Sequence, residues 1–252
     1  MEAHDSEEWD FYPCTIDGRP AAIRVDLGQA RHAPREELPT LLFVSVPLRD
    51  PDERGFVRRE EFDAVTALEG ALRKSLAAGG ARHVGCVTTD GARDFFFYAG
   101  GGRDWEMAVA ESLTAFPDYA YSLQIRDDPE WRSYLEFLYP TRDDMNLIMN
   151  NRVLRQLAEQ GDVAELPRPI DYFLYFPTRE AAEAAARAAV AEGFSLAENG
   201  LAERDGSPPV WQVRLSRIDA PSEIDDITAR LLELADEGDG EFDGWGCLVR
   251  RE

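Results

Sequence analysis

The chain has 252 residues, 44% of them hydrophobic and 10% aromatic, which is enough for one large domain or two ordinary ones with buried cores. Its 27 basic and 49 acidic residues give a net charge of −22, which disfavours direct binding of nucleic acid, whose phosphates attract basic surfaces. There is no apolar run of membrane-spanning length and no signal-peptide pattern at the acidic N-terminus, so we expect a cytoplasmic protein without membrane contact.

The first elements in the chain form a predicted hairpin. Residues 9–16 and 19–27 flank Asp17-Gly18, a dipeptide that readily adopts the positive φ angles of a two-residue hairpin turn. The continuous apolar run over 40–48 predicts a central strand. Residues 58–78 predict a helix, because one face carries apolar residues at helical spacing, namely Phe62, Val65, Leu68, Leu72 and Leu76.

The rest of the first half repeats this alternation. Asp90-Gly91 predicts the turn of a second hairpin, between strands over 82–89 and 92–99. A helix over 105–115 and a strand over 119–126 follow. A short helix is then expected between Pro129, which can open a helix, and Pro140, which closes it.

The second half begins with a capping-box pattern, Thr141 to Asp144, that predicts a helix to about Gln160. A second such pattern, Ser222 to Asp225, predicts another helix near the C-terminus. The remaining predicted elements are a strand over 169–176, a helix from Thr178 to Glu192, paired strands over 194–198 and 210–215 around a polar loop, and a last strand over 240–249.

Residues 40–126 and 167–252 therefore give the same order of elements, strand-helix-strand-strand-helix-strand, which is the ferredoxin-like plan. We predict an α+β protein of two tandem ferredoxin-like units with antiparallel sheets, the first carrying an extra N-terminal hairpin. The boundary is expected near Pro140, which gives domains over residues 1–140 and 141–252.

No catalytic or metal-binding pattern is present in the sequence. The histidines have no second ligand at helical spacing, and the three cysteines are far apart, which disfavours a zinc site or a disulfide framework. Glycine-rich phosphate-binding motifs and nucleophile motifs are absent. We therefore predict no catalytic residue, no metal and no cofactor.

The closing strand contains an unusual motif, Asp243-Gly244-Trp245-Gly246. Glycines weaken a strand and often mark a bulge or a close backbone approach, with Trp245 then packed in the core. Alternatively, Asp243 and Trp245 border a surface that binds a partner, since tryptophan is a frequent interface anchor.

The C-terminal half resembles the regulator of ribonuclease E activity B family over about residues 143–252. The resemblance rests on D-Y-F-L-Y-F (171–176), W-Q-V-R-L (211–215), a leucine-rich helix and the closing E-F-D-G-W-G. It implies a small acidic α+β fold that binds the endonuclease, lowers its activity and has no chemistry of its own. Tyr172 stands where that family tends to carry histidine.

The N-terminal half, over about residues 6–140, is similar to a bacterial domain of unknown function (family 695). Trp9, Tyr12, the stretch V-G-C-V-T-T-D-G-A-R-D-F-F-F-Y (84–98) and Asp128-Pro129-x-Trp131-x-x-Tyr134 carry this resemblance. It implies no activity.

Two functional hypotheses follow, and both place the site on named residues. The first is an acidic, non-enzymatic regulator that binds a protein such as ribonuclease E through Asp243, Gly244, Trp245, Gly246, Asp225 and Asp226; the charge favours a basic partner, although acidity also serves solubility alone. The alternative is an enzyme or small-molecule-binding protein with a cleft between the domains, lined by Trp9, Tyr12, Trp131 and Tyr134. A role in interbacterial or phage defence has no sequence feature in its favour, and the sequence does not predict the oligomeric state.

Overall fold

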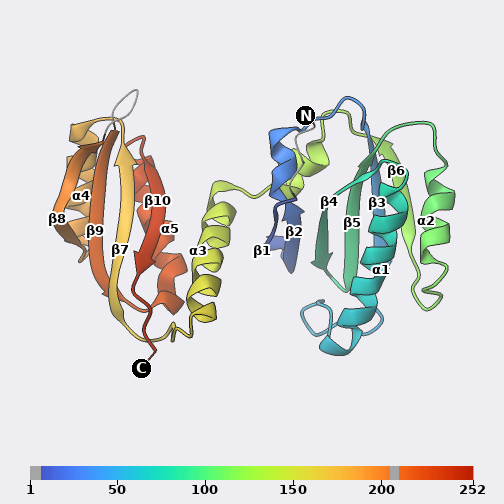
Figure 1. The fold of residues 1–252 in the computed structure, drawn as a ribbon, viewed down its shortest axis with the longest axis horizontal. Coiled ribbons are helices and arrows are strands. Elements are labelled where there is room, and N and C mark those ends of the chain that lie inside the picture. The colour runs from blue at the N-terminus through green and yellow to red at the C-terminus, as the bar shows by residue number, and fades with distance from the viewer. Residues whose placement is uncertain (1–6, 205–209, 252) are drawn as a thin grey trace. The chain divides into compact units, whose positions relative to one another are not determined.

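The computed structural model describes residues 7–204 and 210–251. The chain folds into two compact units, Met1–Asp144 and Met145–Glu252 (Figure 1). Each unit combines an antiparallel sheet with helices, so the predicted α+β class is confirmed. The division lies four residues beyond Pro140, within the first turn of helix α3 (Arg142–Glu159).

The first unit opens with the predicted hairpin of strands β1 (Trp9–Ile16) and β2 (Arg19–Asp26), paired along their full length. Asp17 and Gly18 have φ angles of 50° and 78°, as a two-residue turn of this type requires. A short 3₁₀ turn, η1 (Leu27–Arg31), leads away from β2.

The sheet of the first unit continues with β3 (Thr40–Pro47), β4 (Arg82–Thr89), β5 (Ala92–Ala99) and β6 (Ser122–Asp127). Its strand order among the described residues is β1-β2-β4-β5-β3-β6, and all neighbours are antiparallel. The hairpin therefore extends the sheet beyond β4. Strand β6 begins three residues later than predicted, because Tyr119 is buried in the core and its amide closes a turn onto Phe116.

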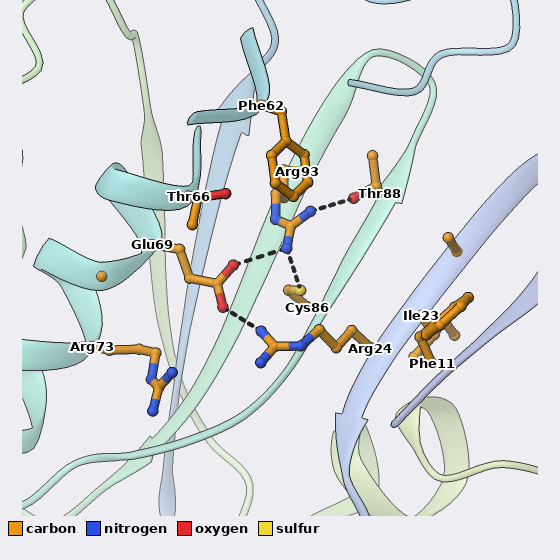
Figure 2. A pocket seen from close by; sticks show the side chains of 12 residues that line it. Phe11, Ile23, Arg24, Phe62, Thr66, Glu69, Arg73, Cys86, Thr88 and Arg93 are labelled. Carbon is orange, nitrogen blue, oxygen red and sulfur yellow. Dashed lines mark hydrogen bonds and ion pairs between the residues drawn. The ribbon is translucent and has the colours of Figure 1, made fainter. Parts of the chain in front are cut away.

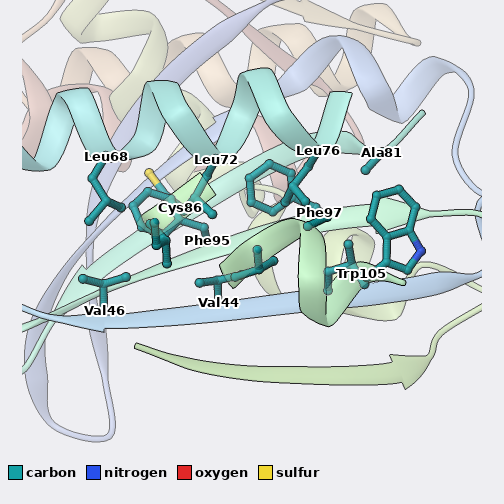
Figure 3. Packing of buried hydrophobic residues seen from close by; sticks show 14 of the residues in the cluster. Val44, Val46, Leu68, Leu72, Leu76, Ala81, Cys86, Phe95, Phe97 and Trp105 are labelled. Atoms are coloured by element: carbon teal, nitrogen blue, oxygen red, sulfur yellow. The ribbon is translucent and has the colours of Figure 1, made fainter. Parts of the chain in front are cut away.

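Helices α1 (Arg59–Ala77) and α2 (Trp105–Leu113) cover one face of this sheet. Figure 3 shows Leu68, Leu72 and Leu76 of α1 packed over Phe95 and Phe97 of β5. The predicted helix is confirmed, but its predicted core face was wrong at one position: Phe62 is 57% exposed. At about 100° per residue, Phe62 lies at the edge of the apolar stripe, on the flank that also carries Glu69 and Arg73.

The opposite face of the sheet is covered by a short π-helical segment, η2 (Ser133–Leu138). Asp128 holds its first turn, because its carboxylate accepts the amides of Arg132 at 2.9 Å and Ser133 at 3.0 Å. The same carboxylate accepts the hydroxyl of Tyr98 at 2.6 Å, which ties η2 to the sheet. The short helix predicted between Pro129 and Pro140 is therefore present.

The second unit follows the order β7 (Arg168–Phe176), α4 (Arg179–Ala191), β8 (Ser195–Arg204), β9 (Val210–Asp219), α5 (Ile224–Asp236) and β10 (Glu241–Cys247). A one-turn 3₁₀ segment, η3 (Pro221–Glu223), precedes α5. The strand order is β10-β7-β9-β8, again antiparallel throughout. Strand β8 runs well past the predicted end at Glu198, and the part of the predicted loop over 205–209 lies outside the described residues.

The core of the second unit lies between this sheet and its helices. The alternate residues Ile170, Tyr172, Leu174 and Phe176 of β7 are all buried, and α4 meets the sheet with a face of alanines, whose small side chains allow close approach.

At the start of α3 the predicted capping box is confirmed, since the Asp144 amide donates to Thr141 Oγ1 at 3.2 Å and the Thr141 amide donates to Asp144 Oδ2 at 3.1 Å.

Candidate functional site

Trp245 is a core residue whose indole N–H is satisfied inside the second unit. It is 8% exposed, and its Nε1 donates to Asn150 Oδ1 of α3 at 2.9 Å. Asn150 Nδ2 in turn donates to Asp225 Oδ1 and to Thr228 Oγ1, both at 2.8 Å. One asparagine thus joins three elements, α3, α5 and β10, and the structure brings Asp225 and Trp245 to the same polar network.

The Asp243-Gly244 step is a β-bulge. The register of β10 against β7 shifts between Phe242, which pairs with Leu174, and Gly244, which pairs with Phe173. Gly244 has φ +115°, a conformation that side chains rarely allow, so this glycine is required by the backbone. Gly246 has an ordinary φ, and a Cβ placed there would meet nothing within 4 Å.

Acidic residues are concentrated in the part of the chain that runs from the start of α5 to the bulge of β10. Between Glu223 and Asp243 the chain has nine acidic residues and a single basic one, Arg230. Arg230 bridges Glu192 and Glu233, each at 2.7 Å. All nine acidic residues are exposed; they are Glu223, Asp225, Asp226, Glu233, Asp236, Glu237, Asp239, Glu241 and Asp243. We call this set the acidic surface.

The capping box predicted at Ser222 and Asp225 was wrong. Helix α5 has no side-chain cap, because Ser222 belongs to η3 and its amide donates to Ala164 O at 3.1 Å. Asp225 instead lies in the first turn of α5, as does Asp226, where a negative charge is favourable.

Tyr172, at the position where the resembled family tends to have histidine, is buried and hydrogen-bonded. Its hydroxyl donates to Asp219 Oδ2 at 2.6 Å, and Arg217 Nε donates to Oδ1 of the same carboxylate at 2.9 Å. Burial, reinforced by the bond to Asp219, raises the pKa of Tyr172 well above its usual value. The tyrosine is therefore a neutral structural donor.

Three of the four aromatic residues assigned to a cleft are buried within the first unit. Tyr12, Trp131 and Tyr134 are at most 2% exposed, so their rings do not face solvent as the lining of an open cleft would. Each of the three donates a hydrogen bond to a backbone carbonyl of the same unit. The Tyr12 hydroxyl donates to Leu138 O, the Trp131 indole N–H to Leu38 O, and the Tyr134 hydroxyl to Asp26 O. The Asp128-to-Tyr134 motif thus fixes η2 on the sheet, with Trp131 stacked on Tyr98 at 4.1 Å.

Trp9, the fourth of these residues, is half-buried beside a pocket of the first unit. The guanidinium of Arg24 lies 4.4 Å from the Trp9 ring centroid and that of Arg73 lies 5.8 Å from it. The pocket, shown in Figure 2, has a volume of about 540 Å³ between α1 and strands β1, β2 and β4. This size is within the range of small-molecule sites.

The carboxylate of Glu69, which lines this pocket, forms ion pairs with two arginines. Glu69 of α1 is 6% exposed and accepts Arg24 Nη1 at 2.5 Å and Arg93 Nη2 at 2.8 Å (Figure 2). Arg93 also donates to Cys86 Sγ at 3.2 Å. Burial nevertheless raises the pKa of the Cys86 thiol to about 11, so it stays protonated at neutral pH and is a poor nucleophile.

Sequence reasoning missed the residues that link these elements. Asn150, Glu69 and Arg24 belong to no motif, and Arg93 lies in the stretch 84–98 without any sign there of its partner; the four residues are separated by tens of residues in the chain. The one signal in the sequence was Glu69, a charged residue beside the apolar stripe of α1, because a carboxylate buried there needs a cationic partner. Among the described residues, no group of His, Cys, Asp or Glu side chains is arranged to hold a metal ion.

Comparison with protein families divides the chain at the same place as the fold does. Residues 7–139 match the model of a family of unknown function, DUF695, and residues 147–247 match the model named Regulator of ribonuclease activity B. The chain belongs to the DUF695 family. Both resemblances inferred from the sequence are thereby confirmed, each on its own half of the chain.

No curated protein is significantly similar to the chain. A crystal structure of an unknown protein from Galdieria sulphuraria has a TM-score of 0.27 and 11% identity, over 84% of this chain and 100% of that one. The crystal structure of a putative glycine cleavage system transcriptional repressor has a TM-score of 0.27 and 9% identity, over 84% of this chain and 98% of that one. In the ranges 7–204 and 210–251, no helix combines the length and apolar character that a membrane span requires.

Proposed function

We propose that this DUF695 protein is a non-enzymatic regulator that binds a ribonuclease, ribonuclease E or a related enzyme, and lowers its activity through its second unit. The observation that carries the proposal is the match of residues 147–247 to Regulator of ribonuclease activity B. The acidic surface supports it, because a ribonuclease binds its substrate through basic side chains that attract phosphates.

The acidic surface offers a way to inhibit without chemistry. Its carboxylates present negative charge where RNA would present phosphates, so they compete for the same cations on the ribonuclease and steer the encounter. Asp226, in the first turn of α5, and Asp243, in the bulge of β10, are exposed and available to a partner. Trp245 and Gly244 contribute indirectly, because they fix the bulge that carries Asp243.

The fold supports a small binding module of this kind. We infer that both units follow the ferredoxin-like plan, since β10-β7-β9-β8 is the strand order 4-1-3-2 of that plan, and β4-β5-β3-β6 is the same order reversed. The two units then correspond to the domains expected over residues 1–140 and 141–252. A cytoplasmic location would place the protein with such a partner.

The test is cleavage of a fluorescent single-stranded RNA by ribonuclease E purified from the same organism, with increasing amounts of the full chain. We expect the apparent KM for RNA to rise with kcat unchanged, and the effect to shrink between about 50 and about 200 mM salt because exposed charges are screened. The triple variant Asp226→Asn, Glu241→Gln, Asp243→Asn should inhibit about tenfold less well.

The matched control removes three exposed acidic residues of the first unit, Glu53→Gln, Glu106→Gln and Glu111→Gln. This control changes the net charge by as much as the first triple variant does. Its inhibition of RNA cleavage should stay within about twofold of that by the natural chain. Equal losses in both triple variants would reject the acidic surface as the binding site. Absence of inhibition at every salt concentration would reject the regulatory function itself.

A further inference from the structure

The pocket of the first unit exists because the sheet is wider than its helical layer. Helix α1 packs over β3, β4 and β5, whereas β1 and β2 extend the same sheet beyond β4. In Figure 2, α1 contributes Phe62, Glu69 and Arg73 from one side, and the hairpin contributes Phe11 and Arg24 from the other. A concave space is left between them that the core does not fill.

Gly70 keeps this space open. It lies within α1, where a glycine is less favourable than alanine by roughly 1 kcal/mol, and a Cβ placed there would meet nothing within 4 Å. The pocket lining includes Gly70. A side chain at this position would therefore enter the pocket without disturbing the core.

The pocket has surplus positive charge in a chain whose net charge is −22. Three guanidiniums line it, those of Arg24, Arg73 and Arg93, with Glu69 as the one lining carboxylate. Glu7 lies outside the lining and accepts Arg73 Nη2 at 3.3 Å. Arg24 and Arg73 remain 36% and 39% exposed, so part of each guanidinium faces solvent at the mouth.

Two exposed aromatic rings complete the pocket. Phe11 of β1 and Phe62 of α1 are 48% and 57% exposed, and neither belongs to the buried core of the first unit. Large apolar side chains that line a pocket together with a few charged groups are typical of small-molecule sites. The buried, protonated thiol of Cys86 provides no nucleophile, so the arrangement indicates binding without covalent chemistry.

We propose that this pocket binds a small organic anion, with its carboxylate or phosphate group at Arg24 and Arg73 and its apolar or aromatic body against Phe11 and Phe62. Guanidiniums form charge-assisted, often bidentate hydrogen bonds with such groups, which fixes the orientation of the anionic end. The inference is independent of ribonuclease binding, since it rests on the first unit alone.

The test uses two dyes of similar shape, the aromatic sulfonate 8-anilinonaphthalene-1-sulfonate and the neutral N-phenyl-1-naphthylamine, titrated into the full chain. The sulfonate should bind at one site per chain and about tenfold more tightly than the neutral dye. Arg73→Gln should weaken sulfonate binding about tenfold and leave the neutral dye unchanged. Gly70→Leu, which fills the pocket, should weaken both dyes at least about tenfold.

Two neighbouring positions on α1 provide matched controls. Lys74→Gln removes an exposed cation that does not line the pocket, and Ala67→Leu adds the same side chain as Gly70→Leu on an exposed position outside it. Both should bind the dyes within about twofold of the natural chain. Competition with phenyl phosphate and with phenylacetate then shows which acid the guanidiniums prefer.

The proposal is overturned if the two dyes bind equally well to the natural chain, or if Gly70→Leu binds them unchanged. It is also overturned if Lys74→Gln weakens the sulfonate as much as Arg73→Gln does, because the effect would then reflect general surface charge. Helical circular dichroism of each variant confirms that α1 is intact, and Arg73→Gln tests the charge without filling any space.

Discussion

His83 is the most strongly perturbed ionisable side chain near the pocket. Its ring stacks on Phe97 at 4.6 Å and lies 5.0 Å from the ring of Trp9. Burial, with the guanidiniums of Arg73 and Arg24 nearby, lowers the pKa of His83 to about 3. The imidazole therefore stays neutral in the folded chain at every pH at which the protein is expected to function.

This residue should make the first unit sensitive to acid. In the unfolded chain its pKa is about 6.5, so between about pH 6.5 and about pH 3 the unfolded state takes up a proton that the folded state does not. Its contribution to stability is complete above about pH 6.5 and is lost as the pH falls, by about 2 kcal/mol at pH 5.

His83→Phe keeps an aromatic ring and removes the titration. We expect the free energy of unfolding of this variant to fall about 2 kcal/mol less between pH 8 and pH 5 than that of the natural chain, as measured by urea denaturation at each pH. The comparison uses the change of the unfolding free energy with pH, so any loss of stability that Phe causes equally at every pH does not affect it. Identical slopes would show that His83 takes up its proton at the same pH in the folded and in the unfolded chain.

Sequence reasoning at the scale of single residues succeeded where a pattern was local. The burial of Trp245 and the bulge at Gly244 were among the predicted alternatives, because glycines flanking a tryptophan in a strand have few structural explanations. Asn150, by contrast, is an ordinary helical residue, and its bond to Trp245 joins positions 95 residues apart. Only the three-dimensional structure shows that pairing.

The bulge in β10 allows the two glycines of one motif to be compared directly. Gly244 has φ +115°, in a region that costs other residues of the order of 1–3 kcal/mol, whereas Gly246 has an ordinary φ and open space at its Cβ. Gly244→Ala should therefore lower the free energy of unfolding by about 1–3 kcal/mol, and Gly246→Ala should change it by less than about 0.5 kcal/mol. Urea denaturation measures both, and equal effects would contradict a special backbone at Gly244.

Most elements could be predicted because their signals are short-range. The two Asp-Gly turns fix both hairpins of the first unit, and Thr141 and Thr178 cap the helices that they were expected to cap. The errors arise where tertiary contacts override local patterns. Strand β6 starts late because Tyr119 is drawn into the core, and Ser222 belongs to η3 instead of capping α5.

At the scale of the whole molecule, each unit has its own hydrophobic core among the residues 7–204 and 210–251. The first involves residues between Leu42 and Tyr119, and the second lies between Leu157 and Trp245. Calorimetry should therefore show two unfolding transitions. Gly244→Ala should lower the midpoint temperature of the second unit's transition only. A change from pH 8 to pH 5 should lower the midpoint temperature of the first unit's transition, and by more in the natural chain than in His83→Phe. A single transition shifted by both variants would contradict two independent folding units.

Charge is distributed evenly at this scale, because residues 1–140 and 141–252 each carry a net charge of −11. The net charge of each half therefore gives no sign of the positively charged pocket. Its guanidiniums, those of Arg24, Arg73 and Arg93, come from three elements and lie close together only in the folded unit. The acidic surface was easier to anticipate, since its residues lie close together in the chain.

The added hairpin also has a consequence for synthesis on the ribosome. Strand β2 emerges early, but its partner β4 is much later in the chain; Ala22, for example, pairs with Thr88. At about 5–20 residues per second, the hairpin waits roughly 3–13 s before this pairing can form. An isolated two-stranded hairpin is only marginally stable, so the nascent chain presents an unpaired strand edge during this interval, which makes it a substrate for chaperones that protect such edges.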